Sequence, residues 1–159
     1  DSRDHEWEYN MKRTAIALVM TLLSALPVSA GNLVEISDAW ARATILTSRP
    51  GVAYLTITSA ATDRLLEITT AVADHVMIHD VVTVDDVRRM RHVMALDVPA
   101  NRPVTLAPGA MHLMLAGLHE KLREGQKFPM TLRFENAGEI SIDVAILGIA
   151  AAGPQGETE

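Results

Sequence analysis

The stretch "GAMHLMLAGL", residues 109–118, has the alternating pattern of a β-strand. Side chains on a strand point in turn to its two faces, so Leu113 and Leu115 share one face while His112 and Met114 share the other. The first face is apolar and predicts contact with a core. The second face carries an imidazole and a thioether where a half-buried strand normally carries Thr, Lys or Glu. The stretch therefore predicts a strand whose outer face has unusual chemistry.

Most of the chain repeats this period of two. Short β-rich segments are separated by turn residues, and they cover residues 33–44, 52–60, 75–82, 92–98, 102–109, 111–118, 128–135 and 139–147. Asn136-Ala137-Gly138 joins the last two segments and is typical of a hairpin loop. Residues 118–126 alone predict a helical turn, and a brief one. We therefore expect an all-β fold, an antiparallel β-sandwich in a single domain.

The composition divides the chain into four segments. Residues 11–30, "MKRTAIALVMTLLSALPVSA", combine a basic start, an apolar run and a small-residue ending, which predicts a secretory signal peptide cleaved after Ala30. The apolar run is short for a membrane span, so we expect no stable membrane insertion after cleavage, with an uncleaved anchor as the alternative. The other three segments are an upstream extension without structural meaning (1–10), the folded domain (31–150) and a flexible tail (151–159).

Charge and cysteine content exclude several classes of function. The chain has a formal net charge of −6 at pH 7, which argues against nucleic acid or anionic lipid as a partner. It has no cysteine, which excludes thiolate catalysis and the Cys-ligated copper of electron-transfer cupredoxins. It also lacks the G-x-S-x-G pattern of one class of serine hydrolase. We therefore expect a protein that is not an enzyme.

Two further residues match the chemistry of His112 and Met114. His79 lies in "HVMIHDVV", and Met90 lies between two arginines, a position that predicts an exposed side chain. Thioether sulfur is a soft, neutral ligand, whereas zinc sites use Cys or carboxylate beside His. Two imidazoles and two thioethers without a thiolate therefore favour Cu(I).

The spacing of these four residues resembles the copper-binding motif of the periplasmic PCu(A)C copper chaperones. Ten residues separate His79 from Met90, and twenty-one separate Met90 from His112-Leu113-Met114. Other stretches similar to that family extend the resemblance over residues 33–147, among them "DAWARAT" (38–44) and "LAPGAMHLMLAGLHEKLREGQKFPMTLRFENAGEI" (106–140).

The resemblance implies a cupredoxin-like antiparallel β-sandwich of Greek-key type that binds Cu(I) through His79, Met90, His112 and Met114. It further implies a periplasmic protein that delivers copper for the binuclear copper site of cytochrome c oxidase. The partner would be the oxidase or a thiol-containing assembly factor. Two features depart from the family. The tail lacks the His and Met residues with which some relatives are thought to bind Cu(II), and Pro108-Gly109-Ala110 replaces the usual Pro-Gly-Gly.

The remaining histidines and methionines of the folded segment have plainer interpretations. We expect a core position for three methionines, Met94, Met111 and Met130. We expect a surface position for three histidines, His75, His92 and His119. His75 and Met77 lie near His79 in sequence and are candidates to assist the copper site. The alternative function is a non-metal envelope interaction module that binds a peptide or protein through a Met-rich face.

Overall fold

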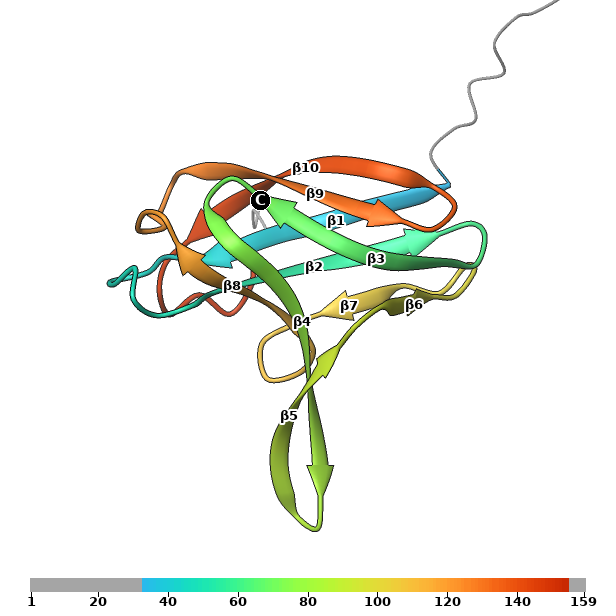
Figure 1. Ribbon diagram of the computed structural model, residues 1–159, viewed down its shortest axis with the longest axis horizontal. Helices are drawn as coiled ribbons and strands as arrows, with labels where there is room; N and C mark the ends of the chain where they lie inside the picture. Colours follow the sequence, from blue (N-terminus) through green and yellow to red (C-terminus); the bar gives the residue numbers. More distant parts are fainter. Residues whose placement is uncertain (1–32, 155–159) are drawn as a thin grey trace, which may run out of the picture. The chain divides into compact units, whose positions relative to one another are not determined.

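The computed structural model describes residues 33–154, and all the regular secondary structure in this range is β-strand (Figure 1). The strands are β1 (Val34–Arg42), β2 (Gly51–Ser59), β3 (Asp63–Thr70), β4 (Ala73–Val84), β5 (Val87–Val93), β6 (Leu96–Val98), β7 (Val104–Leu106), β8 (His112–Leu118), β9 (Lys127–Phe134) and β10 (Gly138–Leu147). The predicted all-β fold is confirmed. The predicted helical turn is wrong, because residues 119–126 form irregular chain between β8 and β9.

Several expectations concern residues outside this range. The upstream extension, the signal peptide and residues 155–159 of the tail lie outside the described residues. Residues 33–154 contain no helix with the length and apolar character needed to cross a membrane.

All ten strands belong to one hydrogen-bonded sheet. Their order is β5-β4-β8-β2-β1-β10-β9-β3-β6, and β7 also pairs with β2. Neighbouring strands are antiparallel, as expected, except that β1 and β10 run parallel, with Ala41 beside Ile146. The first strand, β1, and the last strand of the described chain, β10, therefore lie side by side in the middle of the strand order.

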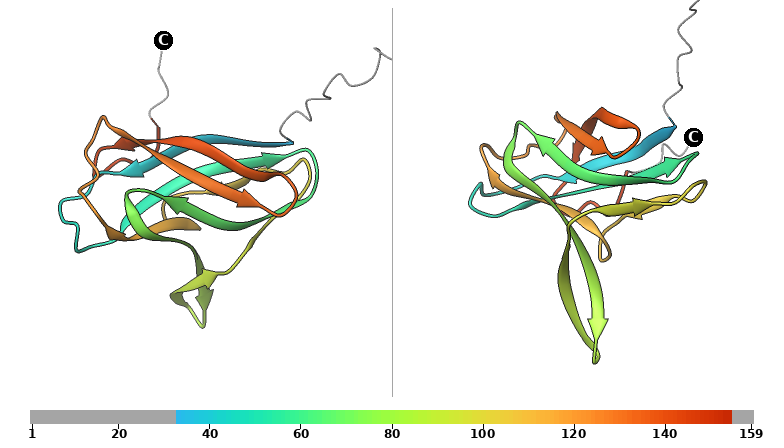
Figure 2. Two further views of the ribbon diagram at one scale, coloured as in Figure 1. Left: turned by 45° about the horizontal axis from the view of Figure 1, so that its top comes forward. Right: turned by 45° about the vertical axis from the view of Figure 1, so that its right-hand side comes forward.

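The sheet curls back on itself because β3 and β4 are consecutive in the chain but distant in the strand order. Six strand spacings would separate them by about 29 Å in a flat sheet. Only Ala71 and Val72 join the two strands, and this link spans about 10 Å at most. One continuous core, built from every strand except β5, accordingly lies between two facing layers (Figure 2). The predicted sandwich is confirmed.

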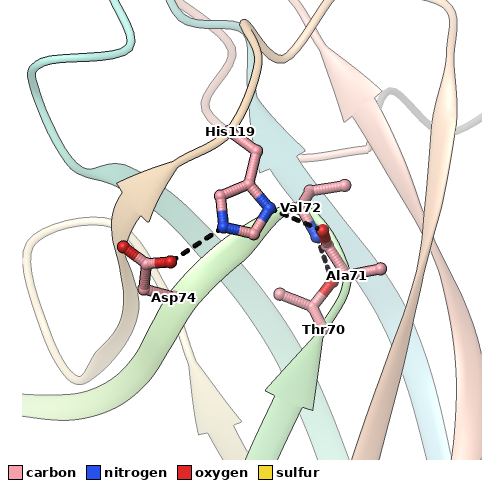
Figure 3. A network of polar contacts seen from close by, with 5 residues as sticks. All are labelled: Thr70, Ala71, Val72, Asp74 and His119. Carbon is pink, nitrogen blue, oxygen red and sulfur yellow. Dashed lines mark hydrogen bonds and ion pairs between the residues drawn. The ribbon is translucent and has the colours of Figure 1, made fainter.

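His119 holds the turn between β3 and β4 against the end of β8 (Figure 3). Its Nδ1 donates to the carbonyl of Ala71 at 3.0 Å, and its Nε2 donates to the carboxylate of Asp74 at 2.8 Å. Both ring nitrogens face acceptors, so only the protonated ring makes both bonds. The hydrogen bond to Asp74 raises the pKa of His119, and the bond to Ala71 adds to this. The turn that closes the sandwich is thus tied to the strand that carries His112.

The second half of β4 leaves the sandwich. Residues 73–79 pair with β8, whereas residues 78–84 pair with β5, so the β4–β5 hairpin projects from the two layers (Figure 1 and Figure 2). Its tip is Asp85-Asp86, where both residues have positive φ (52° and 61°), as a two-residue type I′ turn requires. The sequence predicts one strand over 92–98, but β5 ends at Val93 and β6 begins at Leu96.

Candidate metal centre

His79 lies at the root of this hairpin, where β4 passes from one partner strand to the other. It pairs with His112 of β8 on one side and with His92 of β5 on the other. The ring centroids of His79 and His112 are 5.9 Å apart, and those of His79 and His92 are 5.8 Å apart. Residues directly opposite each other share a face of the sheet. Three imidazoles therefore stand in a row across β8, β4 and β5.

The two predicted thioether residues lie on the same face of these strands. Met114 is half-buried, two residues beyond His112 on β8. Met90 pairs with Val81 on the projecting hairpin, so it lies diagonally to His79, and 69% of its surface is exposed. The exposure that its arginine neighbours predict is confirmed. His79, His112 and Met114 thus occupy adjacent register positions, with Met90 one step toward the hairpin tip.

A backbone carbonyl fixes the ring of His112. Its Nδ1 lies 2.9 Å from the carbonyl oxygen of Ala110. Since a carbonyl only accepts, Nδ1 carries the hydrogen, and in the neutral ring the lone pair is on Nε2. Metal-binding histidines are commonly oriented in this way. Ala110 has no positive φ, so alanine fits where the resembling family usually has glycine.

The surroundings of His79 keep its imidazole neutral. Burial lowers its pKa, and His112 and His92 lower it further because they disfavour a positive charge there. Its Nδ1 is buried and has no hydrogen-bond partner within residues 33–154. Buried polar atoms nearly always have one. A neutral ring with an unpartnered buried nitrogen suits a metal ligand.

Arg88 ties the projecting hairpin to the loop that precedes β8. Its Nη2 donates to the carbonyl oxygen of Gly109 at 2.6 Å. Arg88 is two residues from Met90, so the two side chains share a face of β5. On the opposite face, Arg91 pairs with Asp80 at 3.1 Å. The Arg88 contact therefore holds the Met90 side of the hairpin beside the start of β8.

The available donors restrict the kind of metal ion. Within the described part of the chain, no three His, Asp, Glu or Cys side chains are grouped so that they could hold an ion. Hard and borderline ions need such nitrogen, oxygen or thiolate ligands. The other candidate donors on this face are thioethers, those of Met90 and Met114 among them, and thioether sulfur favours a soft ion such as Cu(I).

One methionine differs from its predicted surroundings. Met94 is expected in the core, but 81% of its surface is exposed, because it lies where the chain leaves β5 and has no core to face. His92 is exposed, as predicted, and it also lies beside His79, a position that the sequence analysis does not predict. The sequence does place His92 two residues from Met90, and residues two apart on one strand share a face. That spacing is the feature that could have indicated the position of His92. Met130 is buried, as predicted.

Two sequence comparisons both match this chain to putative lipoproteins. The family model of LpqE-like putative lipoproteins matches residues 34–146. The putative lipoprotein Lxx21020 of Leifsonia xyli subsp. xyli (strain CTCB07) is 27% identical over 153 residues, which cover 89% of this chain and 92% of that protein.

Solved structures show the same likeness. The copper-bound PCuAC domain from PmoF2 is 28% identical with a TM-score of 0.62, over 73% of this chain and 93% of that domain. The apo PmoF2 domain is also 28% identical, with a TM-score of 0.65, over 76% of this chain and 94% of that domain. Apo-DR1885 from Deinococcus radiodurans shares the fold. It is 23% identical, with a TM-score of 0.58, over 79% of this chain and 89% of that protein. The resemblance to PCu(A)C proteins is confirmed by these neighbours.

Proposed function

Because the chain belongs to the LpqE-like family of putative lipoproteins and folds like PCuAC domains, we propose that it is a Cu(I)-binding chaperone of the cell envelope. The observation that carries the proposal is the pair His79 and His112. One ring is kept neutral by its surroundings, and the other is oriented with Nε2 free to bind. The copper-bound state of the PmoF2 domain supports copper as the cargo.

The proposed ligands are His79, Met90, His112 and Met114. Two imidazole nitrogens and two thioether sulfurs form a neutral donor set, so the bound ion would keep a net charge of +1. A single charge is tolerable here because Met90 extends the site to the surface, although His112 is itself buried. Three of the ligands occupy adjacent register positions on β4 and β8, and the fourth comes from the hairpin.

The proposed role is delivery of copper to an acceptor in the envelope. The acceptor is cytochrome c oxidase, for its binuclear copper site, or a thiol-containing assembly factor. The exposure of Met90 supports delivery, because an incoming ligand can displace a donor that already lies at the surface. The signal-peptide pattern of residues 11–30 supports export to the periplasm.

Anaerobic Cu(I) titration against a colorimetric chelator tests the proposal. We expect one tightly bound equivalent per chain and far weaker binding of Zn²⁺. Replacing His79 or His112 with Gln, or Met90 or Met114 with Leu, should weaken that equivalent at least about tenfold. His119→Gln is the matched control, because it removes an imidazole that bonds elsewhere. Recovery of apo protein, or a preference for Zn²⁺, would contradict the proposal and favour the interaction module.

A further inference from the structure

A cavity of about 560 Å³ lies next to the proposed copper site. It is lined by β3, the first half of β4, the end of β5 and Met94, which follows β5. Two imidazoles and two thioethers border it: His75, His92, Met77 and Met94. The proposed site uses none of these four, and none of the four proposed ligands lines the cavity.

Two of the cavity residues are cross-strand neighbours of proposed ligands. His92 pairs with His79, and Met77 pairs with Met114. Side chains directly opposite each other in an antiparallel pair have Cβ atoms about 5 Å apart. His92 and Met77 of the cavity are therefore directly adjacent to His79 and Met114 of the proposed site.

Packing and charge pairing do not account for three of these side chains, whereas Met77 is half-buried. Met94 is 81% exposed, and His75 and His92 are exposed as well. The two carboxylates that line the cavity are already engaged, Glu67 with Arg133 at 2.9 Å and Asp74 with His119 at 2.8 Å. What the cavity still offers is imidazole nitrogen and soft thioether sulfur, a donor combination that favours Cu(I).

The register and the cavity lining place three of these residues near one another. Met77 lies two positions from His79 on β4, so it is diagonal to His92 across the β4–β5 pair. Diagonal neighbours are about 7–8 Å apart, within reach of long side chains. Met94 follows His92 by two residues at the rim of the same cavity. His75 lies two positions from Met77 on β4, farther along the cavity wall.

We propose that His92, Met77 and Met94 form a second, weaker Cu(I) site, with His75 as an additional donor. The inference rests on the proposed function, because it concerns a second equivalent of the same ion. Copper passes between the two sites by ligand exchange, in which one neutral donor replaces another and the ion stays Cu(I). The second site is the weaker one because its donors are more exposed and no backbone bond orients them as Ala110 orients His112.

Anaerobic Cu(I) titration of the full chain with two chelators of different strength tests this inference. Against the strong chelator, the wild type should bind one equivalent; against the weak chelator, it should bind two. Met94→Leu is the cleanest variant, because Met94 has no register partner in the proposed site. It should weaken the second equivalent at least tenfold and leave the first unchanged, and Met77→Leu should also weaken the second. Met111→Leu, which removes a half-buried thioether outside both the cavity and the proposed site, is the matched control and should retain both.

Methionine methyl NMR gives an independent readout. The methyl signal of Met94 should move on addition of the second equivalent, after those of Met90 and Met114 have moved with the first. A wild type that stops at one equivalent against the weak chelator would overturn the second site and leave the proposed function intact. Met94→Leu and Met77→Leu variants that both keep the second equivalent would overturn it too. Failure to bind the first equivalent would instead refute the proposed function.

Discussion

His79 and His112 face each other across β4 and β8, but their rings are held by different means. The ring of His112 is oriented by a hydrogen bond to the Ala110 carbonyl, whereas His79 has a buried Nδ1 without a partner among residues 33–154. Burial and the neighbouring imidazoles lower the pKa of His79. The ring of His112 thus suits metal binding through its orientation, and the ring of His79 through its protonation state.

The first prediction follows from this protonation state. Cu(I) affinity should fall as the pH drops from about 7 to 5, because protons compete with copper for imidazole nitrogen but not for thioether sulfur. Since the pKa of His79 is lowered, competition at this residue begins at a lower pH than at an ordinary histidine. Met90→Leu and Met114→Leu should weaken binding without changing the slope, whereas His112→Gln should flatten it. Affinity that is independent of pH would exclude direct binding by the histidines.

The second prediction concerns the contact between Arg88 and Gly109. Arg88→Ala frees the hairpin that carries Met90, so Cu(I) affinity should fall about tenfold with little change in thermal stability. Arg89→Ala is the matched control, because it removes the same charge from the opposite face of β5. Chelator competition measures both variants. Equal losses would mean that charge, rather than the contact, affects copper binding.

The third prediction concerns two glycines with positive φ. A Cβ at Gly117 (φ 67°) would collide with the carboxylate of Asp74, whereas a Cβ at Gly138 (φ 75°) meets nothing within 4 Å. Gly138→Ala should therefore cost only the backbone strain, about 1–2 kcal/mol of unfolding free energy. Gly117→Ala should cost about 2–4 kcal/mol, since the collision adds to the strain. Urea denaturation measures the difference, and equal costs would show that Asp74 moves aside freely.

The fourth prediction concerns the pH dependence of stability. The pKa of His119 is raised in the folded protein, so the protonated ring stabilises the fold. This stabilisation is complete below the unfolded pKa of about 6.5 and is lost as the pH rises through the folded value. His119→Gln should therefore lower the melting temperature more at pH 5.5 than at pH 9. A difference that grows toward high pH would have the wrong sign.

The period-two pattern is sufficient to predict which face a residue occupies, but it does not identify the neighbouring strand. Leu113 and Leu115 are fully buried, and His112 and Met114 lie on the other face, as the sequence predicts. The register of His79 opposite His112 depends on pairing between segments that are distant in the chain. Spacing that resembles a known motif indicates such a site, but it cannot show that His92 lies beside it.

The divided strand over residues 92–98 and the exposure of Met94 have a common physical cause. Residues 92–98 alternate like one strand, yet the chain bends after Val93 because β5 pairs with the projecting part of β4 while β6 pairs with β3. Met94 lies at this bend and faces solvent. A local pattern cannot report a change of partner strand, since the partners are set by the closed sandwich.

The central position of β10 determines when the fold can form. β10 is the last strand of the described chain, yet it lies between β1 and β9 and joins the two parts of the strand order. Until β10 is present, the group β9-β3-β6 is not joined by strand pairing to the strands that carry His79 and His112. Without β10, the edge of β9 that normally pairs with it also stays open to pairing with other chains. Cooperative folding of the described strands therefore waits for β10 to be synthesised, and chains shortened before β10 should aggregate rather than fold.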